Sequence, residues 1–183
     1  MQTAWNNRGD PVRLREPLLE DAEALFALID RDRQDLRRYL PWVDQTLTVQ
    51  DELRYLQQEA ELAELDGRKS WLIELGGRLA GRIGFHYLNS SDQTEIGYFL
   101  ASPWRGRGLM TEAVRALAQY ALVERGIVCL QICVAETNLA SIAVARRAGA
   151  HLSGRRPLGA HRDGLPEDGL IFSLSREEWL THA

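Results

Sequence analysis

Few features of this sequence point to export, a membrane or a covalent crosslink. The amino-terminal stretch MQTAWNNRGD is polar, and no apolar run approaches the ~20 residues of a membrane span, so we expect a soluble cytoplasmic protein. The two cysteines, Cys129 and Cys133, both fall in the alternating segment IVCLQICV, which would hold them ~13 Å apart along one strand. Because a disulfide cannot span that distance, we interpret both as small buried hydrophobic residues in a reducing compartment.

Metals and nucleic acids are further ligands for which the sequence offers little. It contains no Cys-x-x-Cys pair and no cluster among its 4 histidines, so no metal site is predicted. The formal net charge of -4 provides no general attraction to nucleic acid. Arginines instead gather at Arg105 and Arg107 and again at Arg155 and Arg156, which favours local anion sites over direct nucleic-acid binding.

What remains is one continuous series of helices and strands, without a repeat or a long linker. A hydrophobic fraction of 45% is enough for one core, so we predict a single domain over residues 1–183. The spacing predicts a mixed α/β (α+β) fold with a strand at 12–14, helices over 18–32 and 50–65, antiparallel strands SWLIEL, RLAGRIGFHYL and TEIGYFL, a helix over 108–125, strand IVCLQICV, a helix over 138–148, and final strands AHLSGRRPL and GLIFSLS. The polar stretch between the final two strands, about a dozen residues long, is interpreted as a functional loop.

The segment from TEIGYFL through ASPWRGRG delivers a glycine-rich turn into the first turn of a helix. Unpaired backbone N–H groups and the helix dipole attract anions there, and glycines let a phosphate approach the backbone closely. Arg105 and Arg107 add charge, and Thr111 adds a hydroxyl. The alternative is an ordinary turn whose glycines only supply unusual dihedral angles. Because neither a dinucleotide fingerprint nor a P-loop is spelled out, we predict a diphosphate site of another kind.

A family resemblance rests on the same segment. EIGYFLASPWRGRGLMTEAV resembles the signature of GNAT N-acetyltransferases, Q/R-x-x-G-x-G/A, with Arg105 and Gly108 matching and Met110 replacing the last small residue. Met before Thr-Glu, together with TNLASIAVARRAG, resembles the RimL/RimJ-like branch of ribosomal-protein-serine/alanine acetyltransferases. The resemblance covers almost the whole chain. It implies a mostly antiparallel sheet of about six to seven strands flanked by about four helices, a cleft between the fourth and fifth strands, and acetyl-CoA as cosubstrate without a metal.

The resemblance also implies which residues bind the coenzyme. The turn would hold the pyrophosphate, and backbone groups of TEIGYFL would hold the pantetheine arm and could stabilise a developing oxyanion. Ser141 would hydrogen-bond to the leaving sulfur, since the tyrosine that many relatives use is matched here by Ala145. From the spelling alone, Asn138 is a helix N-cap and Ser141 a small first-turn residue. The expected coenzyme-binding residues are Tyr98, Phe99, Leu100, Arg105, Gly106, Arg107, Gly108, Leu109, Met110, Thr111, Asn138 and Ser141.

A general base is harder to identify. The glutamate proposed as base in ribosomal-protein-serine acetyltransferases is matched here by Ala160. The substitutes are Glu95, His86 and His161, and each has an ordinary alternative as a strand-end carboxylate, a sheet histidine or an exposed loop residue. At pH 7 an α-amine of pKa ~7.8 is roughly 14% neutral, whereas a lysine of pKa ~10.4 is about 0.04% neutral. The lack of an obvious base therefore favours an α-amine, with Ser141, Glu95 and His161 as the catalytic candidates.

The acceptor is expected to meet Tyr39, Trp42, Asp44 and His86, although core packing explains Trp42 equally well. We predict direct attack on acetyl-CoA, in a ternary complex, by the N-terminal α-amine of a protein or peptide. The alternatives that stay open are a small-molecule amine acceptor such as a polyamine or a drug, a non-catalytic acyl-CoA-binding module, and a nucleotide-binding domain that uses the same turn. A homodimer, common among relatives, is an assembly that the resemblance allows.

Overall fold

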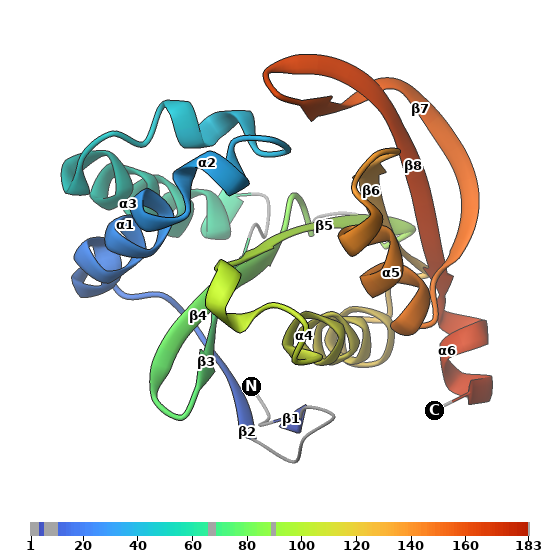
Figure 1. The fold of residues 1–183 in the computed structure, drawn as a ribbon. Helices are drawn as coiled ribbons and strands as arrows, with labels where there is room; N and C mark the ends of the chain where they lie inside the picture. The colour runs from blue at the N-terminus through green and yellow to red at the C-terminus, as the bar shows by residue number, and fades with distance from the viewer. Residues whose placement is uncertain (1–3, 6–10, 66–68, 89–90, 183) are drawn as a thin grey trace.

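One twisted sheet runs through the computed structural model, which describes residues 4–5, 11–65, 69–88 and 91–182 (Figure 1). The strand order is β1-β2-β3-β4-β5-β6-β8-β7, and every neighbouring pair is antiparallel except β5 and β6. The predicted class and strand succession are confirmed; the described part of the chain adds a two-residue edge strand, β1. The strands are β1 (Ala4–Trp5), β2 (Pro11–Arg15), β3 (Ser70–Leu75), β4 (Arg78–Phe85), β5 (Gln93–Leu100), β6 (Cys129–Ala135), β7 (His151–Arg162) and β8 (Leu165–Ser175).

The helices lie on both sides of this sheet (Figure 1). The predicted helix over 108–125 is α-helical only to Ala118 and then widens into a π-helical turn, η4. No helix in the described ranges is long and apolar enough to cross a membrane. The helices are α1 (Ala22–Arg31), α2 (Arg33–Leu36), α3 (Val49–Leu65), α4 (Leu109–Ala118), η4 (Gln119–Glu124), α5 (Leu139–Arg147) and α6 (Arg176–His182), with short 3-10 turns η1 (Leu19–Asp21), η2 (Pro41–Asp44) and η3 (Ser102–Trp104).

The end of the chain corrects one prediction. In place of the predicted polar loop, β7 and β8 continue as paired strands, with Ala160 opposite Glu167, and meet at Asp163 and Gly164. These two residues have φ angles of 51° and 82°, as expected for a two-residue hairpin turn with the preferred Asp-Gly sequence. The polar side chains do not prevent pairing, because a hairpin needs only its backbone groups to be matched. His161 is therefore a strand residue.

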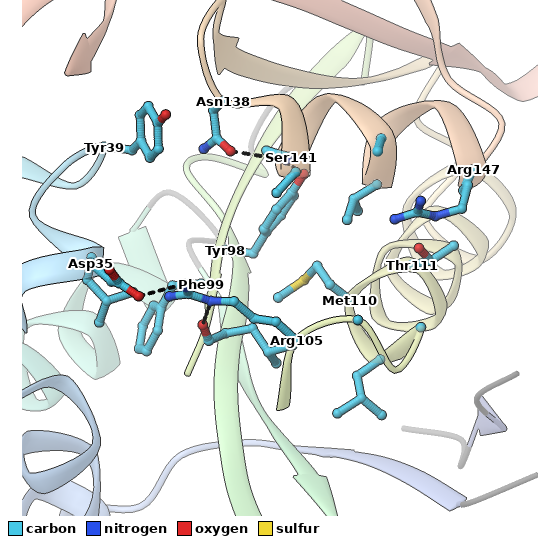
Figure 2. Close-up of a pocket in the computed structure, with 18 of the residues that line it drawn as sticks. Asp35, Tyr39, Tyr98, Phe99, Arg105, Met110, Thr111, Asn138, Ser141 and Arg147 are labelled. Atoms are coloured by element: carbon cyan, nitrogen blue, oxygen red, sulfur yellow. Dashed lines mark hydrogen bonds and ion pairs between the residues drawn. The ribbon is translucent and has the colours of Figure 1, made fainter. Parts of the chain in front are cut away.

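The parallel pair opens the cleft that the resemblance implied. β5 and β6 are in register only from Gln93 opposite Cys129 to Glu95 opposite Gln131. Beyond Glu95 the strands separate, while β5 stays paired with β4 on its other edge as far as Leu100. Figure 2 shows the space that results, with β5 on one side and α5 on the other.

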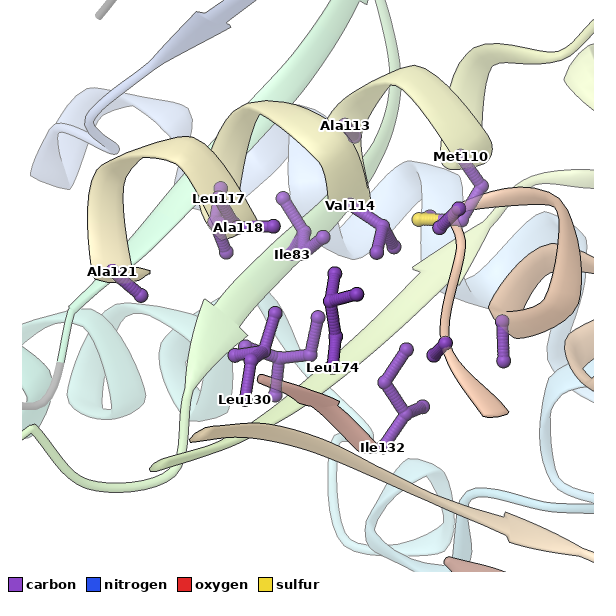
Figure 3. Close-up of a cluster of buried hydrophobic side chains, with 14 of the residues drawn as sticks. Ile83, Met110, Ala113, Val114, Leu117, Ala118, Ala121, Leu130, Ile132 and Leu174 are labelled. Carbon is purple, nitrogen blue, oxygen red and sulfur yellow. The ribbon is translucent and has the colours of Figure 1, made fainter. Parts of the chain in front are cut away.

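The core fixes both walls of this cleft. Leu72 of β3 packs with α1 and α3, whereas its neighbour Ile73 belongs to the cluster under α4, as expected for a strand that is buried on both faces. Apolar residues of α4 such as Val114 and Leu117 pack over Ile83 of β4 and over β6 (Figure 3). The two cysteines are free and only half-buried, so the prediction that both are buried is wrong. They lie at the ladder between β6 and β8 rather than in this cluster.

Candidate active site

A cavity of about 730 Å³ occupies the cleft. It lies between the carboxyl-terminal half of β5, the first turn of α4 and the face of α5 that carries Ser141 (Figure 2). The predicted coenzyme-binding residues all line it, apart from Arg107. The guanidinium of Arg107 instead lies 5.2 Å from the centre of the Trp104 ring.

The turn before α4 has the conformation that its glycines permit. Gly106 and Gly108 have φ angles of 72° and 82°, a region that residues with a Cβ atom avoid. A Cβ at Gly106 would contact nothing within 4 Å, so the requirement for glycine there is conformational. Gly108 caps α4, whose first N–H groups have no intrahelical partner and belong to residues lining the cavity.

Thr111 in that first turn has an unusual hydroxyl. Its Oγ1 is buried and has no hydrogen-bond partner within the described part of the chain. Thr111 lines the cavity (Figure 2). Because a buried polar group without a partner costs about 1–3 kcal/mol, this hydroxyl is suited to a ligand that accepts or donates a hydrogen bond.

The arginines around the cavity differ in how much charge they can offer. Arg105 forms an ion pair of 3.1 Å with Asp35 and donates a hydrogen bond of 2.9 Å to the Leu100 carbonyl, so it braces the turn. Arg147, which the sequence did not single out, lines the cavity three residues beyond Val144. Across the described ranges its guanidinium has no ion pair or hydrogen bond. Arg147 is therefore the free cation of this cavity among the described residues.

Asn138 and Ser141 line the cavity from the start of α5, where Ser141 contacts β5. The Asn138 side chain accepts a hydrogen bond of 3.1 Å from the backbone N–H of Ser141, so it is an N-cap of α5. The Ser141 Oγ lies 2.7 Å from the Tyr98 hydroxyl (Figure 2). Burial raises the pKa of Tyr98 to about 12, although its hydrogen bond with Ser141 lowers it in part, and the phenol stays protonated at neutral pH. Ala145 is fully buried and does not line the cavity.

A second cavity of about 460 Å³ adjoins the first. Both cavities are lined by Leu40, Tyr98 and Phe99, so they lie next to the same part of β5. Two of the predicted acceptor residues line the second cavity, Trp42 and His86. The Trp42 ring lies 5.7 Å from the Phe99 ring, so Trp42 both packs and lines the cavity.

A buried charged cluster forms the wall of the second cavity, and sequence reasoning missed it. Arg82 of β4 hydrogen-bonds to Glu59 and, at 2.9 Å, to the Ser70 hydroxyl, and lies 3.4 Å from Glu52. Burial raises the pKa of Glu52, which the Arg82 charge opposes and the Glu59 charge reinforces. Glu52 and Glu59 are seven residues apart on α3 and therefore share one helix face. This spacing in the sequence already indicates that the two carboxylates lie on the same side of the helix.

Glu95 and His86 form a second pair beside this cavity. Glu95 is 8% exposed and accepts a hydrogen bond of 2.7 Å from Arg156, while His86 Nδ1 lies 3.4 Å from its other oxygen. Burial alone would raise the pKa of Glu95, but the hydrogen bonds and charges of His86 and Arg156 outweigh it and lower the pKa to about 2. Glu95 lines neither cavity, whereas the His86 side chain is 56% exposed and lines the second.

We expect the Glu95→Gln variant to lose stability at neutral pH. A carboxylate whose folded pKa is about 2 instead of 4.5 contributes up to ~3 kcal/mol, which the exposure of Arg156 reduces to about 2. This contribution is complete above the unfolded pKa and is lost as pH falls from about 5 towards 2. The free energies of unfolding of the wild type and of Glu95→Gln, measured with urea across that pH range, should therefore become equal at acid pH. Glu136→Gln, which removes an exposed partner of Arg155, is the matched control. If the difference in unfolding free energy between the wild type and Glu95→Gln does not change with pH, the ionised carboxylate is not its origin.

The remaining predicted residues lie in different places. Tyr39 lines the first cavity and donates a hydrogen bond of 3.2 Å to the Thr137 carbonyl. Asp44 is exposed, pairs with Arg37 at 3.0 Å and lines neither cavity. His161 lies opposite Pro166 in the hairpin and also lines neither. Among the described residues no group of three or more His, Cys, Asp or Glu side chains could hold a metal ion.

Known proteins share this architecture. A family model described as "Acetyltransferase (GNAT) domain" matches residues 12–151. "Putative ribosomal N-acetyltransferase YdaF" of Bacillus subtilis (strain 168) is 32% identical over 182 residues, which cover 98% of this chain and 98% of that protein. RimL, a ribosomal L7/L12 alpha-N-protein acetyltransferase in complex with coenzyme A, has the same fold, with a TM-score of 0.85 at 24% identity over 91% of this chain and 95% of that one. The Salmonella typhimurium acetyl transferase that modifies the N-terminal serine of 50S ribosomal subunit protein L7/L12 has a TM-score of 0.80 at 25% identity, over 90% and 94% of the two chains.

Proposed function

This chain belongs to the GNAT acetyltransferases and is an acetyl-CoA-dependent N-acetyltransferase, and from that premise we propose that it acetylates a protein or peptide N-terminal α-amine by direct attack in a ternary complex. The observation that carries the proposal is that Tyr98 and Phe99 line two cavities, one suited to a coenzyme and one to an acceptor. The names of two relatives, one a ribosomal N-acetyltransferase and one that modifies an N-terminal serine, support this acceptor class. We also propose that residues 1–183 form one catalytic domain, because β8 pairs with β6 within the same sheet.

The first cavity fits coenzyme A in its chemistry. The amides of the Gly106–Gly108 turn, the unpaired Thr111 hydroxyl and the free Arg147 guanidinium are donors for phosphate oxygens. The free edge of β5 near Tyr98 offers backbone groups to the amides of a pantetheine arm. When bound, acetyl-CoA supplies a thioester, whose carbonyl carbon is the electrophile of the reaction.

We expect the Thr111→Val variant to bind coenzyme A more weakly without losing stability. The change removes a hydroxyl that has no partner in the free protein, so the unfolding free energy should stay equal or rise by about 1 kcal/mol. The same change should weaken coenzyme A binding by roughly 5- to 30-fold, equivalent to about 1–2 kcal/mol. Titration calorimetry and thermal unfolding measure the two effects. Thr181→Val, on α6 and away from both cavities, serves as the control; unchanged affinity in Thr111→Val would exclude this contact.

His86 is the base that this geometry favours. The Nδ1 atom of His86 faces Glu95, and its Nε2 atom lies beside Gly97. A Cβ atom added to Gly97 would be only 2.4 Å from this Nε2. Gly97 adjoins Tyr98 and lines the second cavity. We therefore propose that His86 accepts the acceptor's proton and that Glu95, held by Arg156, positions the imidazole. An imidazole nitrogen that carries no proton has a lone pair that can accept one, which is the chemistry a general base needs.

The type of base bears on the type of amine. Whichever base accepts the proton, removing it from a lysine ammonium of pKa ~10.4 costs about 3.5 kcal/mol more than removing it from an α-ammonium of pKa ~7.8. An imidazole therefore suits an α-amine far better. In the transfer, the neutral nitrogen forms a bond to the acetyl carbonyl carbon and becomes positively charged. The carbon–sulfur bond breaks, its electron pair leaves with sulfur, and the nitrogen gives up its second proton to leave a neutral amide.

Competing peptides test the proposed function. The rate of coenzyme A release should be higher with a peptide that begins with a free serine than with an acetyl-capped peptide that offers one lysine. A peptide that is capped and lacks lysine supplies the background rate. A preference for the lysine peptide, or for a polyamine, would overturn the proposed acceptor. Initial rates at varied concentrations of both substrates should give intersecting lines, whereas parallel lines would exclude the ternary complex.

A further inference from the structure

Tyr98 links the two edges of the cleft through a single hydrogen bond. It lies on β5 opposite Ile83 of β4, beyond the last residue that pairs β5 with β6. Its hydroxyl lies 2.7 Å from the Ser141 Oγ of α5. Both residues line the first cavity, and Tyr98 also lines the second. The hydroxyl pair therefore belongs to the first cavity, on a residue that the second cavity also contacts.

We propose that Tyr98 positions the Ser141 hydroxyl for the departing sulfur by donating its phenolic proton to the Ser141 Oγ. The inference rests on the proposed function, because it needs a thioester in the first cavity. Two hydroxyls share one hydrogen bond, so one proton lies between them and the other is free. If Tyr98 is the donor, the proton of Ser141 is free to point into the cavity.

The acidity of the two groups determines the direction of this bond. A phenol is a far stronger acid than an aliphatic alcohol, and the better donor in a phenol–alcohol pair is the phenol. The Tyr98 ring is buried, so its hydroxyl stays protonated. The backbone N–H of Ser141 is already bound to the Asn138 side chain, which fixes the start of α5 and hence the place of the Oγ. The serine proton is left to point towards the cavity that both residues line.

The role of Tyr98 is positional. As the carbon–sulfur bond breaks, the negative charge on sulfur accepts the hydrogen bond of Ser141, and the thiolate later takes a proton from solvent. The nitrogen loses one proton before it attacks and a second after it has bonded to the acetyl carbon, and each passes through His86 to water. Tyr98 keeps its own proton throughout, and it acts by holding the serine hydroxyl in the donating orientation.

The test compares leaving groups. We expect Tyr98→Phe to lower kcat with acetyl-CoA by roughly tenfold while KM for acetyl-CoA changes by less than about twofold. With acetyl-seleno-CoA, whose selenolate is a better leaving group, the loss in kcat should shrink to within about twofold. Tyr120→Phe, which removes a phenol that packs against Trp71 and Phe85, is the matched control. An equal loss with both donors would mean that Tyr98 only holds the cleft together, and it would overturn the proposal.

A double substitution gives an independent check. Because Tyr98 acts through Ser141, Tyr98→Phe should cause no further loss of kcat in a Ser141→Ala background, whereas additive losses would overturn the proposal. If Tyr98→Phe does not fold, 3-fluorotyrosine at position 98 keeps the shape and strengthens the donor. It should retain the wild-type kcat or exceed it, and a tenfold loss there would also refute the role. A wild-type protein that transfers acetyl to no amine would instead refute the proposed function.

Discussion

Replacing His86 with alanine is expected to lower kcat/KM for an N-terminal serine peptide by roughly 100-fold at pH 7, the usual contribution of a general base. The reason is the position of the imidazole, between the buried carboxylate of Glu95 and the second cavity. The loss should shrink as pH rises through the pKa of the amine, ~7.8, because the acceptor then loses its proton to water. Rates of the variant and of the wild type between pH 6 and 9.5 measure both effects.

Two further variants separate base chemistry from packing. His86→Asn retains a side chain that can hydrogen-bond to Glu95, but it cannot take a proton, so it should behave like His86→Ala. His151→Ala removes an exposed histidine that pairs with Glu178 at 3.2 Å and should leave the rate unchanged. A His86→Ala loss that is the same at every pH would exclude a base role for His86, since a merely misplaced substrate is not rescued by deprotonation.

The order of elements and the coenzyme cleft could be predicted because they depend on local patterns. The alternating strands, the amphipathic face of α4 and the Asn138 cap each lie within about a dozen consecutive residues. No short stretch of sequence indicates that β5 and β6 pair in parallel. The glycine-rich turn after β5, however, indicates where the chain leaves the sheet. The Asp163–Gly164 turn was also a local signal, which the polar composition around it obscured.

The acceptor side could not be predicted in the same way, because its chemistry comes from long-range contacts. Arg82 meets a glutamate 23 residues away, and Arg156 meets Glu95 across 61 residues of chain. Whether Glu95 or His86 serves as the base depends on which of the two side chains is buried. The amino-acid sequence around these residues does not show which one that is. Arg147 was missed for a related reason, since its three-residue spacing from Val144 indicates a shared face only when that face is known to line a cavity.

The second large effect is expected at Ser141. Ser141→Ala should lower kcat by roughly ten- to a hundredfold at saturating acetyl-CoA, the equivalent of about 1.4–2.8 kcal/mol. One charge-assisted hydrogen bond to the leaving sulfur would account for this range, because a thiol of pKa ~8.5 already leaves readily as its thiolate. Steady-state turnover at saturating acetyl-CoA, with binding of the coenzyme measured separately, checks the expectation.

The size of the Ser141 effect should depend on the hydroxyl and not on the volume of the side chain. Ser141→Thr retains a hydroxyl near Tyr98 and should recover part of the lost rate, whereas Ser141→Cys, with a weaker donor, should recover less. Ser153→Ala, in the β7–β8 hairpin and away from both cavities, removes a hydroxyl bonded to Ser173 and should not change kcat. If Ser141→Ala turns over at the wild-type rate, the sulfur leaves without help from α5, and Tyr98 then has no group through which to act.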